Sequence, residues 1–270
     1  MGLFSRKILN PYASEEYSIK SIKKLNEDTA LLTIKTKMNP MPGQFLQVNI
    51  PMVGEAPISN ASYNHKELEL LVRNVGNVTN HILNLNKNDK IRLRGPYGHG
   101  YPMNEMHNCD IVLIGGGTGT APPRSVIQYI QKHRNNFGDV IIFFGFRGPK
   151  EILFQNDFAA WQKDFKFYLT VDKADPGSGY EGKVGLVTDL IEQTNLPEKA
   201  KVILCGPPIM IKFSIEKLLK KGIREDNIYI SMERHMKCGI QKCGHCMIHD
   251  KYSCKDGPVF KYNEIKNVTE

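Results

Sequence analysis

The sequence lacks any apolar run long enough to cross a membrane. Its longest strongly apolar run, VIIFFGF (140–146), is far shorter than the roughly 20 residues that a spanning helix needs. The first ten residues, MGLFSRKILN, contain no apolar stretch followed by a cleavage site of the kind that signal peptides have. We therefore expect a cytoplasmic protein without a membrane span.

Arginine-rich tracts interleaved with aromatic residues are also lacking, although the formal net charge is +8. The lysines are spread along the chain, and the densest cluster, KLLKKGIR (217–224), has the spacing of a solvated helix face. Nucleic acid is accordingly not an expected partner. The positive charge still permits contact with an acidic protein or an anionic surface.

Cysteine is scarce, with six residues among 270. A chain of this length can bury two ordinary cores, so it needs no disulfide framework. Most of the cysteines lie within residues 238–254, whereas Cys109 and Cys205 stand apart. In a reducing cytoplasm, thiols clustered in this way are metal ligands or redox groups more often than disulfides.

Residues 14–104 consist of short runs in which apolar and polar residues alternate, such as TALLTIKT, QFLQVNI and LELLVRN. Alternation with a period of two is typical of strands, and many short strands with frequent turns predict a small antiparallel β-barrel. One helix interrupts this pattern, because NVTNHILNL (77–85) follows Gly76 and has apolar residues at helical spacing.

Residues 105–230 alternate buried strands with amphipathic helices, as in DIVLIGG followed by PRSVIQYIQKHRNN. This order predicts parallel pairing and a doubly wound sheet. Ligands on such a sheet bind beyond the carboxyl ends of the strands, where GGGTGTAPPRS (115–125) and CGPPIM (205–210) lie. The predicted fold class is thus multidomain: a β-barrel, a parallel α/β domain and a small C-terminal segment, 231–270.

The glycine-rich stretch at 115–125 is a candidate site for a dinucleotide pyrophosphate. Glycine lets the backbone approach a ligand closely, and the N–H groups and dipole at a helix start attract an anion. Proline at position 122 departs from the G-x-G-x-x-G fingerprint, so a purely structural tight turn is the alternative. A second candidate phosphate-binding site is the start of the barrel helix, where the Thr79 hydroxyl lies. The alternative interpretation is an ordinary helix cap that binds no ligand.

The C-terminal segment has little periodic apolar pattern, and its cysteines dominate it. Their spacing is Cys-x4-Cys-x2-Cys-x7-Cys, at Cys238, Cys243, Cys246 and Cys254. The first three match the plant-type spacing around a [2Fe–2S] cluster, whereas the final spacer is much shorter than in that pattern. Zinc bound by four thiolates is the alternative, and His245 and His249 are alternative ligands.

The sequence resembles the ferredoxin–NADP reductase superfamily over about residues 14–262. The features that carry the resemblance are the barrel with one phosphate-binding helix, the two glycine-containing loops and the cysteine tail. Within this superfamily, VGEAPISN and MERHMKCGIQKCGHCMIHDKYSCKDGPVF look most like the B subunits of anaerobic sulfite reductases. Gamma subunits of sulfhydrogenases are a close second, and electron-transfer subunits of dihydroorotate dehydrogenase are more distant.

The resemblance implies FAD in the barrel, NADH or NADPH as substrate on the parallel sheet, and a [2Fe–2S] cluster held by the four clustered cysteines. The stretch APIS (56–59) falls where the superfamily has Arg-x-Tyr-Ser. Carried over by position, the implied FAD-binding residues are Pro57, Ile58, Ser59, Arg73, Gly76, Val78 and Thr79.

Two substitutions depart from the superfamily pattern at the flavin. Ala56 replaces the arginine that pairs with phosphate, and Ile58 replaces the tyrosine that stacks on the flavin ring. We therefore expect either weaker FAD binding or a substitute role for Arg73. Ser59 keeps its place beside the flavin, at the reacting centre.

On the nucleotide side, the resemblance places Gly117, Thr118 and Gly119 at the pyrophosphate, and Cys205, Gly206 and Pro207 near the nicotinamide. Cys205 would thus face the reacting centre together with Ser59. The stretch FGFRGPKE (144–151) does not decide between the two nucleotides, because Arg147 and Lys150 suit a 2′-phosphate whereas Glu151 suits a free ribose.

The implied function is an electron-transfer subunit that oxidises NADH and delivers electrons to partner subunits. By resemblance, these partners are an iron–sulfur subunit and a sirohaem-containing catalytic subunit, or else a hydrogenase or a dihydroorotate dehydrogenase. A flavin is required between the other two centres, because nicotinamide gives up two electrons at once and an iron–sulfur cluster accepts one. A zinc-stabilised binding module for RNA or an acidic protein is the alternative of a different class.

Overall fold

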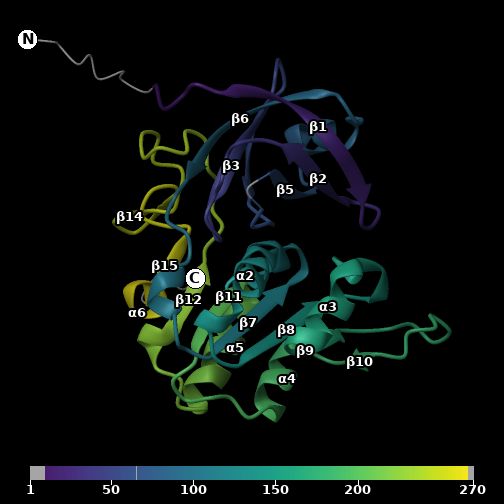
Figure 1. The fold of residues 1–270 in the computed structure, drawn as a ribbon, viewed down its shortest axis with the longest axis vertical. Coiled ribbons are helices and arrows are strands. Elements are labelled where there is room, and N and C mark those ends of the chain that lie inside the picture. Colours follow the sequence, from purple (N-terminus) through teal and green to yellow (C-terminus); the bar gives the residue numbers. More distant parts are fainter. Residues whose placement is uncertain (1–9, 65, 267–270) are drawn as a thin grey trace, which may run out of the picture.

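The computed structural model describes residues 10–64 and 66–266, which form three parts (Figure 1). An antiparallel sheet lies at the top of the view, a parallel sheet with helices lies below it, and the cysteine-containing segment runs beside both. No helix in these ranges is long and apolar enough to cross a membrane. Residues 1–9, where no signal peptide is expected, and 267–270, at the end of the predicted cysteine segment, lie outside the described residues.

The N-terminal part is an antiparallel sheet with the strand order β4-β3-β6-β1-β2-β5. A bridge between Asn60, directly after β4, and Leu70 of β5 joins its two edges, so the sheet curls into the predicted barrel. Its inward-facing aliphatic side chains, such as Leu32, Leu46 and Leu70, are completely buried in one core, as alternation with a period of two requires. The elements are β1 (Glu15–Lys24), β2 (Thr29–Lys35), β3 (Phe45–Ile50), β4 (Gly54–Ser59), β5 (Glu67–Arg73), α1 (Asn77–Leu83) and β6 (Lys90–Tyr97).

The second part confirms the predicted parallel α/β domain. Its sheet has the order β10-β9-β8-β7-β11-β12-β15, in which every neighbouring pair is parallel except β12 and β15. The strands are β7 (Ile111–Gly116), β8 (Val140–Phe146), β9 (Lys166–Val171), β10 (Lys183–Val184), β11 (Lys201–Cys205), β12 (Ile228–Ser231) and β15 (Val259–Lys261). The last strand comes from the C-terminal segment, so the tail is joined to this sheet.

Helices cover both faces of the parallel sheet. One apolar core contains side chains of α2 (Ala121–Lys132) and α3 (Phe158–Asp164) and also Leu31 and Leu71 of the barrel, so the barrel packs on this side. The opposite core contains side chains of α4 (Val187–Gln193) and α5 (Pro208–Lys220). Short 3-10 turns join these elements at η1 (Met103–Met106), η2 (Gly117–Thr120), η3 (Arg134–Asn136), η4 (Pro149–Glu151), η5 (Gln155–Asp157) and η6 (Glu225–Asn227).

The cysteine-containing segment leaves β12, folds beside β3 and β6, and returns as β15 (Figure 1). Its regular structure is a hairpin of β13 (Met247–Ile248) and β14 (Lys251–Tyr252), followed after β15 by α6 (Tyr262–Ile265). Cys246 and Cys254 are buried with Phe45 of β3 in a small core of their own. The segment is therefore anchored to the barrel at one side and to the parallel sheet at its end.

Candidate flavin, nucleotide and iron–sulfur sites

Strand β4 presents the predicted flavin residues on two faces. Ile58 is 8% exposed and packs in the barrel core. Pro57 and Ser59 take the opposite face, because successive side chains of a strand alternate. Ser59 pairs with Phe45, whose ring packs against two buried cysteines. The structure therefore places Ser59 on the sheet face that meets the cysteine segment, and Ile58 on the other face.

The mouth of α1 is organised by the Thr79 hydroxyl. This hydroxyl accepts the N–H groups of Val75 and Gly76, at 2.9 and 3.0 Å, and donates to the carbonyl of Gly76. A methyl group at Gly76 would meet no atom within 4 Å, so the backbone here is open. Val78 is partly buried against the barrel core. Thr79 thus shapes the turn, and a phosphate role for this turn stays a prediction.

Arg73, the expected substitute for the missing arginine, already has a carboxylate partner. Its Nε donates to Asp28 Oδ2 at 2.8 Å, and the pair is about half exposed, at 46% and 42%. Burial raises the pKa of Asp28, but hydrogen bonds from Thr29 and Arg73 outweigh this effect and lower it. Arg73 therefore stands at the end of β5 as a paired surface cation.

The two predicted nucleotide loops lie against each other. β7 and β11 are neighbouring parallel strands with Cys205 opposite Gly115, so the loops that follow them meet at one edge of the sheet. A methyl group at Gly119 would lie 2.6 Å from Gly206 Cα and 2.7 Å from the Cys205 carbonyl oxygen. Gly117, in contrast, adopts φ +55° beside open space. This geometry leaves room for a ligand at Gly117 and Thr118 and explains why position 119 carries no side chain.

Helix α2 begins directly after this loop, at Ala121, with proline in its first turn as predicted. Thr120 donates from its hydroxyl to the carbonyl of Gly117 at 2.7 Å and so closes the turn. On the ribose side, Arg147, Lys150 and Glu151 are all exposed after β8. The preference for one nucleotide over the other stays a prediction.

Cys205 lies in a group of polar side chains that the sequence analysis missed. Its side chain is 1% exposed, and burial and the nearby Glu233 carboxylate raise the pKa of the thiol. Tyr101, which comes from the loop after β6, lies close to Cys205, and burial raises its pKa as well. Glu233 as a residue is exposed. Protein atoms nevertheless surround its carboxyl group, and this desolvation raises the pKa of that group. Its position just beyond β12, at a carboxyl end of the sheet, was the available signal.

The four clustered thiols approach one another in two pairs. Cys243 is within hydrogen-bonding reach of Cys238, and Cys254 is within reach of Cys246. Within residues 10–64 and 66–266, no three Cys, His, Asp or Glu side chains gather around a single ion position. Two pairs of thiols match the ligand set of a cluster with two irons, each held by two thiolates, so these residues fit such a group.

The peptide backbone around the cysteines is arranged to receive negative charge on sulfur. Cys238 Sγ accepts the N–H groups of Ile240 and Lys242, at 3.4 and 3.2 Å, and Cys254 Sγ accepts that of Gln241 at 3.2 Å. Backbone hydrogen bonds lower the pKa of the exposed Cys243 thiol. Burial and the neighbouring thiols raise that of Cys254. His245 and His249, the alternative ligands, are both exposed.

Family models match all three parts of the chain. The oxidoreductase FAD-binding domain matches residues 16–101, the oxidoreductase NAD-binding domain matches 113–216, and the iron–sulfur cluster binding domain of dihydroorotate dehydrogenase B matches 233–266. The sulfhydrogenase 1 gamma subunit of Pyrococcus furiosus is 36% identical over 274 residues, covering 95% of this chain and 93% of that protein. The chain belongs to the ferredoxin–NADP reductase-like superfamily.

A second relative and a solved structure are also similar to this chain. A probable electron-transfer subunit of dihydroorotate dehydrogenase B from Pyrococcus furiosus is 33% identical, with 87% of this chain and 85% of that protein covered. An NADH-dependent reduced ferredoxin–NADP oxidoreductase has the same fold, with a TM-score of 0.77, 22% identity, and coverage of 96% and 94%. The chain thus carries an oxidoreductase FAD-binding domain, an oxidoreductase NAD-binding domain and an iron–sulfur cluster binding domain, as its sequence predicts.

For this superfamily member, we expect Gly119→Ala to lower kcat/KM for NADH by about tenfold or more. The added methyl group must push the two nucleotide loops apart, and misplacing bound reactants by about 1 Å can cost about 100-fold in rate. Stopped-flow reduction of the flavin by NADH measures the effect. In Gly177→Ala the methyl group meets no atom within 4 Å, and the strain of its left-handed backbone, φ +83°, falls on an exposed loop, so the rate should change little. An unchanged rate in Gly119→Ala would place the nucleotide elsewhere.

Proposed function

We propose that this chain oxidises NADH and passes the electrons, one at a time, to partner subunits, with FAD and a [2Fe–2S] cluster as resident cofactors. One observation carries the proposal: the paired thiols lie against the barrel face that carries Ser59. A bound flavin supplies the necessary chemistry, because it exchanges two electrons with a nicotinamide and single electrons with an iron–sulfur centre.

In this proposal each part of the chain holds one group. Pro57, Ser59 and the turn at Gly76, Val78 and Thr79 bind FAD. The loops at 117–119 and 205–207 bind the nucleotide, and the end of β11 at Cys205 lies near the nicotinamide. The four clustered cysteines bind the two irons. The backbone N–H groups that already point at Cys238 and Cys254 stabilise the thiolate form.

Electrons leave this chain beside Cys243 in our proposal. Cys243 has the exposed side chain among the four clustered cysteines, while Cys246 and Cys254 are each 2% exposed. Its neighbours Lys242 and His245 are also exposed. The cluster edge at Cys243 is therefore the place where a partner subunit approaches it most closely.

We propose an anaerobic sulfite reductase as the partner complex, with an iron–sulfur subunit and a sirohaem-containing catalytic subunit. The resemblance of GEAPIS and of the cysteine tail to its B subunits supports this choice. The 36% identity to a sulfhydrogenase gamma subunit favours a hydrogenase as the second candidate. Affinity purification from the native host separates the two, because a sirohaem-containing partner supports the first and a hydrogenase subunit rejects it.

The cofactor proposal is tested by metal and flavin analysis together with an anaerobic visible spectrum before and after NADH. We expect two irons per flavin, as the [2Fe–2S] type requires, and both the flavin bands and the broad iron–sulfur absorption should bleach on reduction. A colourless protein that contains zinc and no iron would reject the proposal and support a zinc-stabilised binding module instead.

A further inference from the structure

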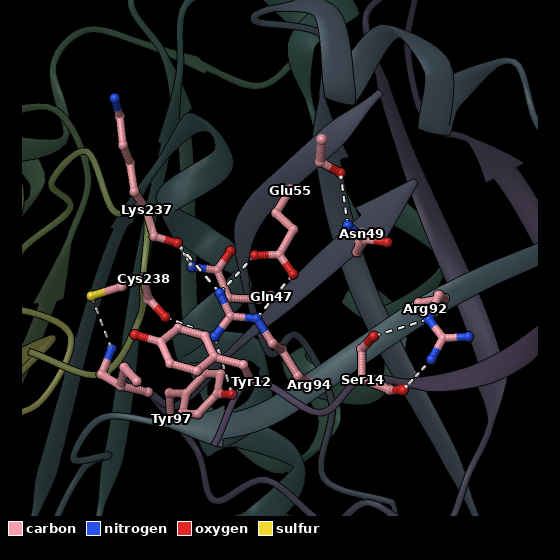
Figure 2. A network of polar contacts seen from close by, with 12 residues as sticks. Tyr12, Ser14, Gln47, Asn49, Glu55, Arg92, Arg94, Tyr97, Lys237 and Cys238 are labelled. Atoms are coloured by element: carbon pink, nitrogen blue, oxygen red, sulfur yellow. Dashed lines mark hydrogen bonds and ion pairs between the residues drawn. The ribbon is translucent and has the colours of Figure 1, made fainter. Parts of the chain in front are cut away.

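A buried arginine of the barrel joins the flavin strand to the cysteine loop. Arg94 of β6 is 3% exposed and forms a two-pronged ion pair with Glu55 of β4, at 2.9 and 2.6 Å. The same guanidinium donates to the carbonyl oxygen of Cys238 at 2.7 Å and to that of Lys237 at 3.3 Å (Figure 2). The strands and the loop are far apart in the sequence, so this contact exists only in the folded chain.

We propose that Arg94 is a positioning residue that holds the first cluster-ligand cysteine at a set place relative to the flavin strand. The inference rests on the proposed function and deepens it. Glu55 shares its face of β4 with Pro57 and Ser59, because side chains two residues apart point the same way. The Glu55–Arg94–Cys238 chain of contacts therefore links the predicted flavin face directly to the loop that holds the cluster.

The chemistry of the site requires arginine at this position. A guanidinium presents five N–H donors in one rigid plane, so it can serve a carboxylate and two carbonyl groups together. The guanidinium is charged at any physiological pH. Its orientation is set by the two hydrogen bonds that it donates to the Glu55 carboxylate. A lysine would keep the positive charge but would lack the planar set of N–H donors that contacts the carboxylate and the carbonyl groups together.

Neighbouring side chains hold this contact in place. The rings of Tyr12 and Tyr97 lie 5.7 and 5.4 Å from the guanidinium carbon, and Tyr97 donates to the carbonyl of Pro11 at 2.7 Å. Gln47, which is fully buried on β3, also donates to the Lys237 carbonyl, at 3.4 Å. The Lys237–Cys238 backbone is thus held by donors from two strands, and Figure 2 shows these side chains converging on it.

The opposite side of Cys238 is held by its own loop, whose N–H groups bond to the sulfur. Fixing the carbonyl of a residue fixes its peptide plane and thereby the direction of its Cα–Cβ bond. Outer contacts of this kind orient metal ligands, and their loss typically costs about 10- to 100-fold in metal affinity or activity. Arg94 thus acts on the cluster through the backbone of Cys238, without touching the metal.

The test compares Arg94→Lys with Arg92→Lys. Arg92 is a matched control, since it lies on the same face of β6 and bonds to Ser14 instead of the cysteine loop (Figure 2). The readouts are the iron content, the electron paramagnetic resonance spectrum and midpoint potential of the reduced cluster, and the rate at which the reduced flavin passes electrons to the cluster. NADH-to-flavin reduction is measured in parallel.

For Arg94→Lys we expect a slower flavin-to-cluster step, by about 10- to 100-fold, with an altered cluster spectrum or potential. NADH-to-flavin reduction should stay within about twofold, and Arg92→Lys should resemble the unmodified protein. An unchanged cluster spectrum, potential and transfer rate in Arg94→Lys would overturn the inference. Equal losses in both variants, or an equal loss of flavin reduction by NADH, would also overturn it, because they indicate a general structural role.

A second variant covers the case in which Arg94→Lys does not fold. Glu55→Gln keeps the shape of the partner but removes its charge, so it should reproduce the spectral change in weaker form, and an unchanged spectrum would count against the inference. Failure of the proposed function is recognised separately. Unmodified protein without iron would reject the cluster itself, whereas a normal cluster that is insensitive to Arg94 and Glu55 rejects only the positioning role.

Discussion

Cys243→Ser is expected to remove the iron–sulfur cluster and to abolish electron delivery to the physiological partner subunit, while NADH still reduces the flavin. Serine is a poor replacement for a thiolate ligand, because an alcohol does not ionise at neutral pH as a thiol with a lowered pKa does. The Cys243 side chain is exposed, so the fold should tolerate the change. The nucleotide loops belong to the parallel sheet and are not altered.

Iron analysis and two rate measurements check this result. Iron should fall close to zero, reduction of the physiological partner subunit should fall to background, and flavin reduction by NADH should stay within about twofold. Cys109→Ser is the matched control, because Cys109 lies outside the cysteine segment and bonds only weakly to the His107 carbonyl, at 3.6 Å. Full electron delivery by iron-free Cys243→Ser would contradict the proposed route.

Arg124→Met is expected to lower the free energy of unfolding by about 3 kcal/mol, the lower end of the range for breaking a buried ion pair. Arg124 is 5% exposed and donates to Glu69 of β5 and to Asp157, each at 2.6 Å. It also donates to the carbonyl of Ala61 at 2.7 Å. Without the cation, two partly buried carboxylates and a carbonyl lose their partner.

Thermal unfolding followed by fluorescence measures the loss, which should lower the midpoint by about 6 °C or more in a protein of this size. Arg224→Met is the control, because its pair with Asp226 is exposed, with Arg224 at 75%, and such pairs contribute less than about 1 kcal/mol. A midpoint that changes equally little in both variants would show that Arg124 does not stabilise the junction between barrel and parallel sheet.

Arg94 and Arg124, both buried, perform corresponding tasks at two junctions of the barrel. Arg124, at the start of α2 beside the nucleotide loop, ties the barrel to the parallel sheet. Arg94 ties it to the cysteine segment. Electron transfer between bound groups depends on their separation, so both contacts belong to the function we propose as much as to stability.

Local sequence patterns alone predicted several elements of this protein. The run VIIFFGF predicts a strand buried on both faces, and every residue of β8 is buried. Glycines followed by proline predict a loop that opens a helix, and α2 begins there. The cysteine spacing predicts a ligand loop, and the thiols do approach one another. Each of these sequence patterns lies within a stretch of about twenty residues. Over such a short stretch, the local geometry of the chain alone limits the structures that can form.

The tertiary structure alone decided which distant residues meet. The face of β4 that carries Ser59, the pairing of β12 with β15, and the contacts of Arg94 and Arg124 have no local signature. Glu233 likewise joins Cys205 only because parallel strands bring their carboxyl ends to one edge. Strand register and sheet order arise from packing over the whole chain. In the sequence, Arg94 and Arg124 therefore cannot be distinguished from arginines on the surface. Only the tertiary structure shows that they are buried.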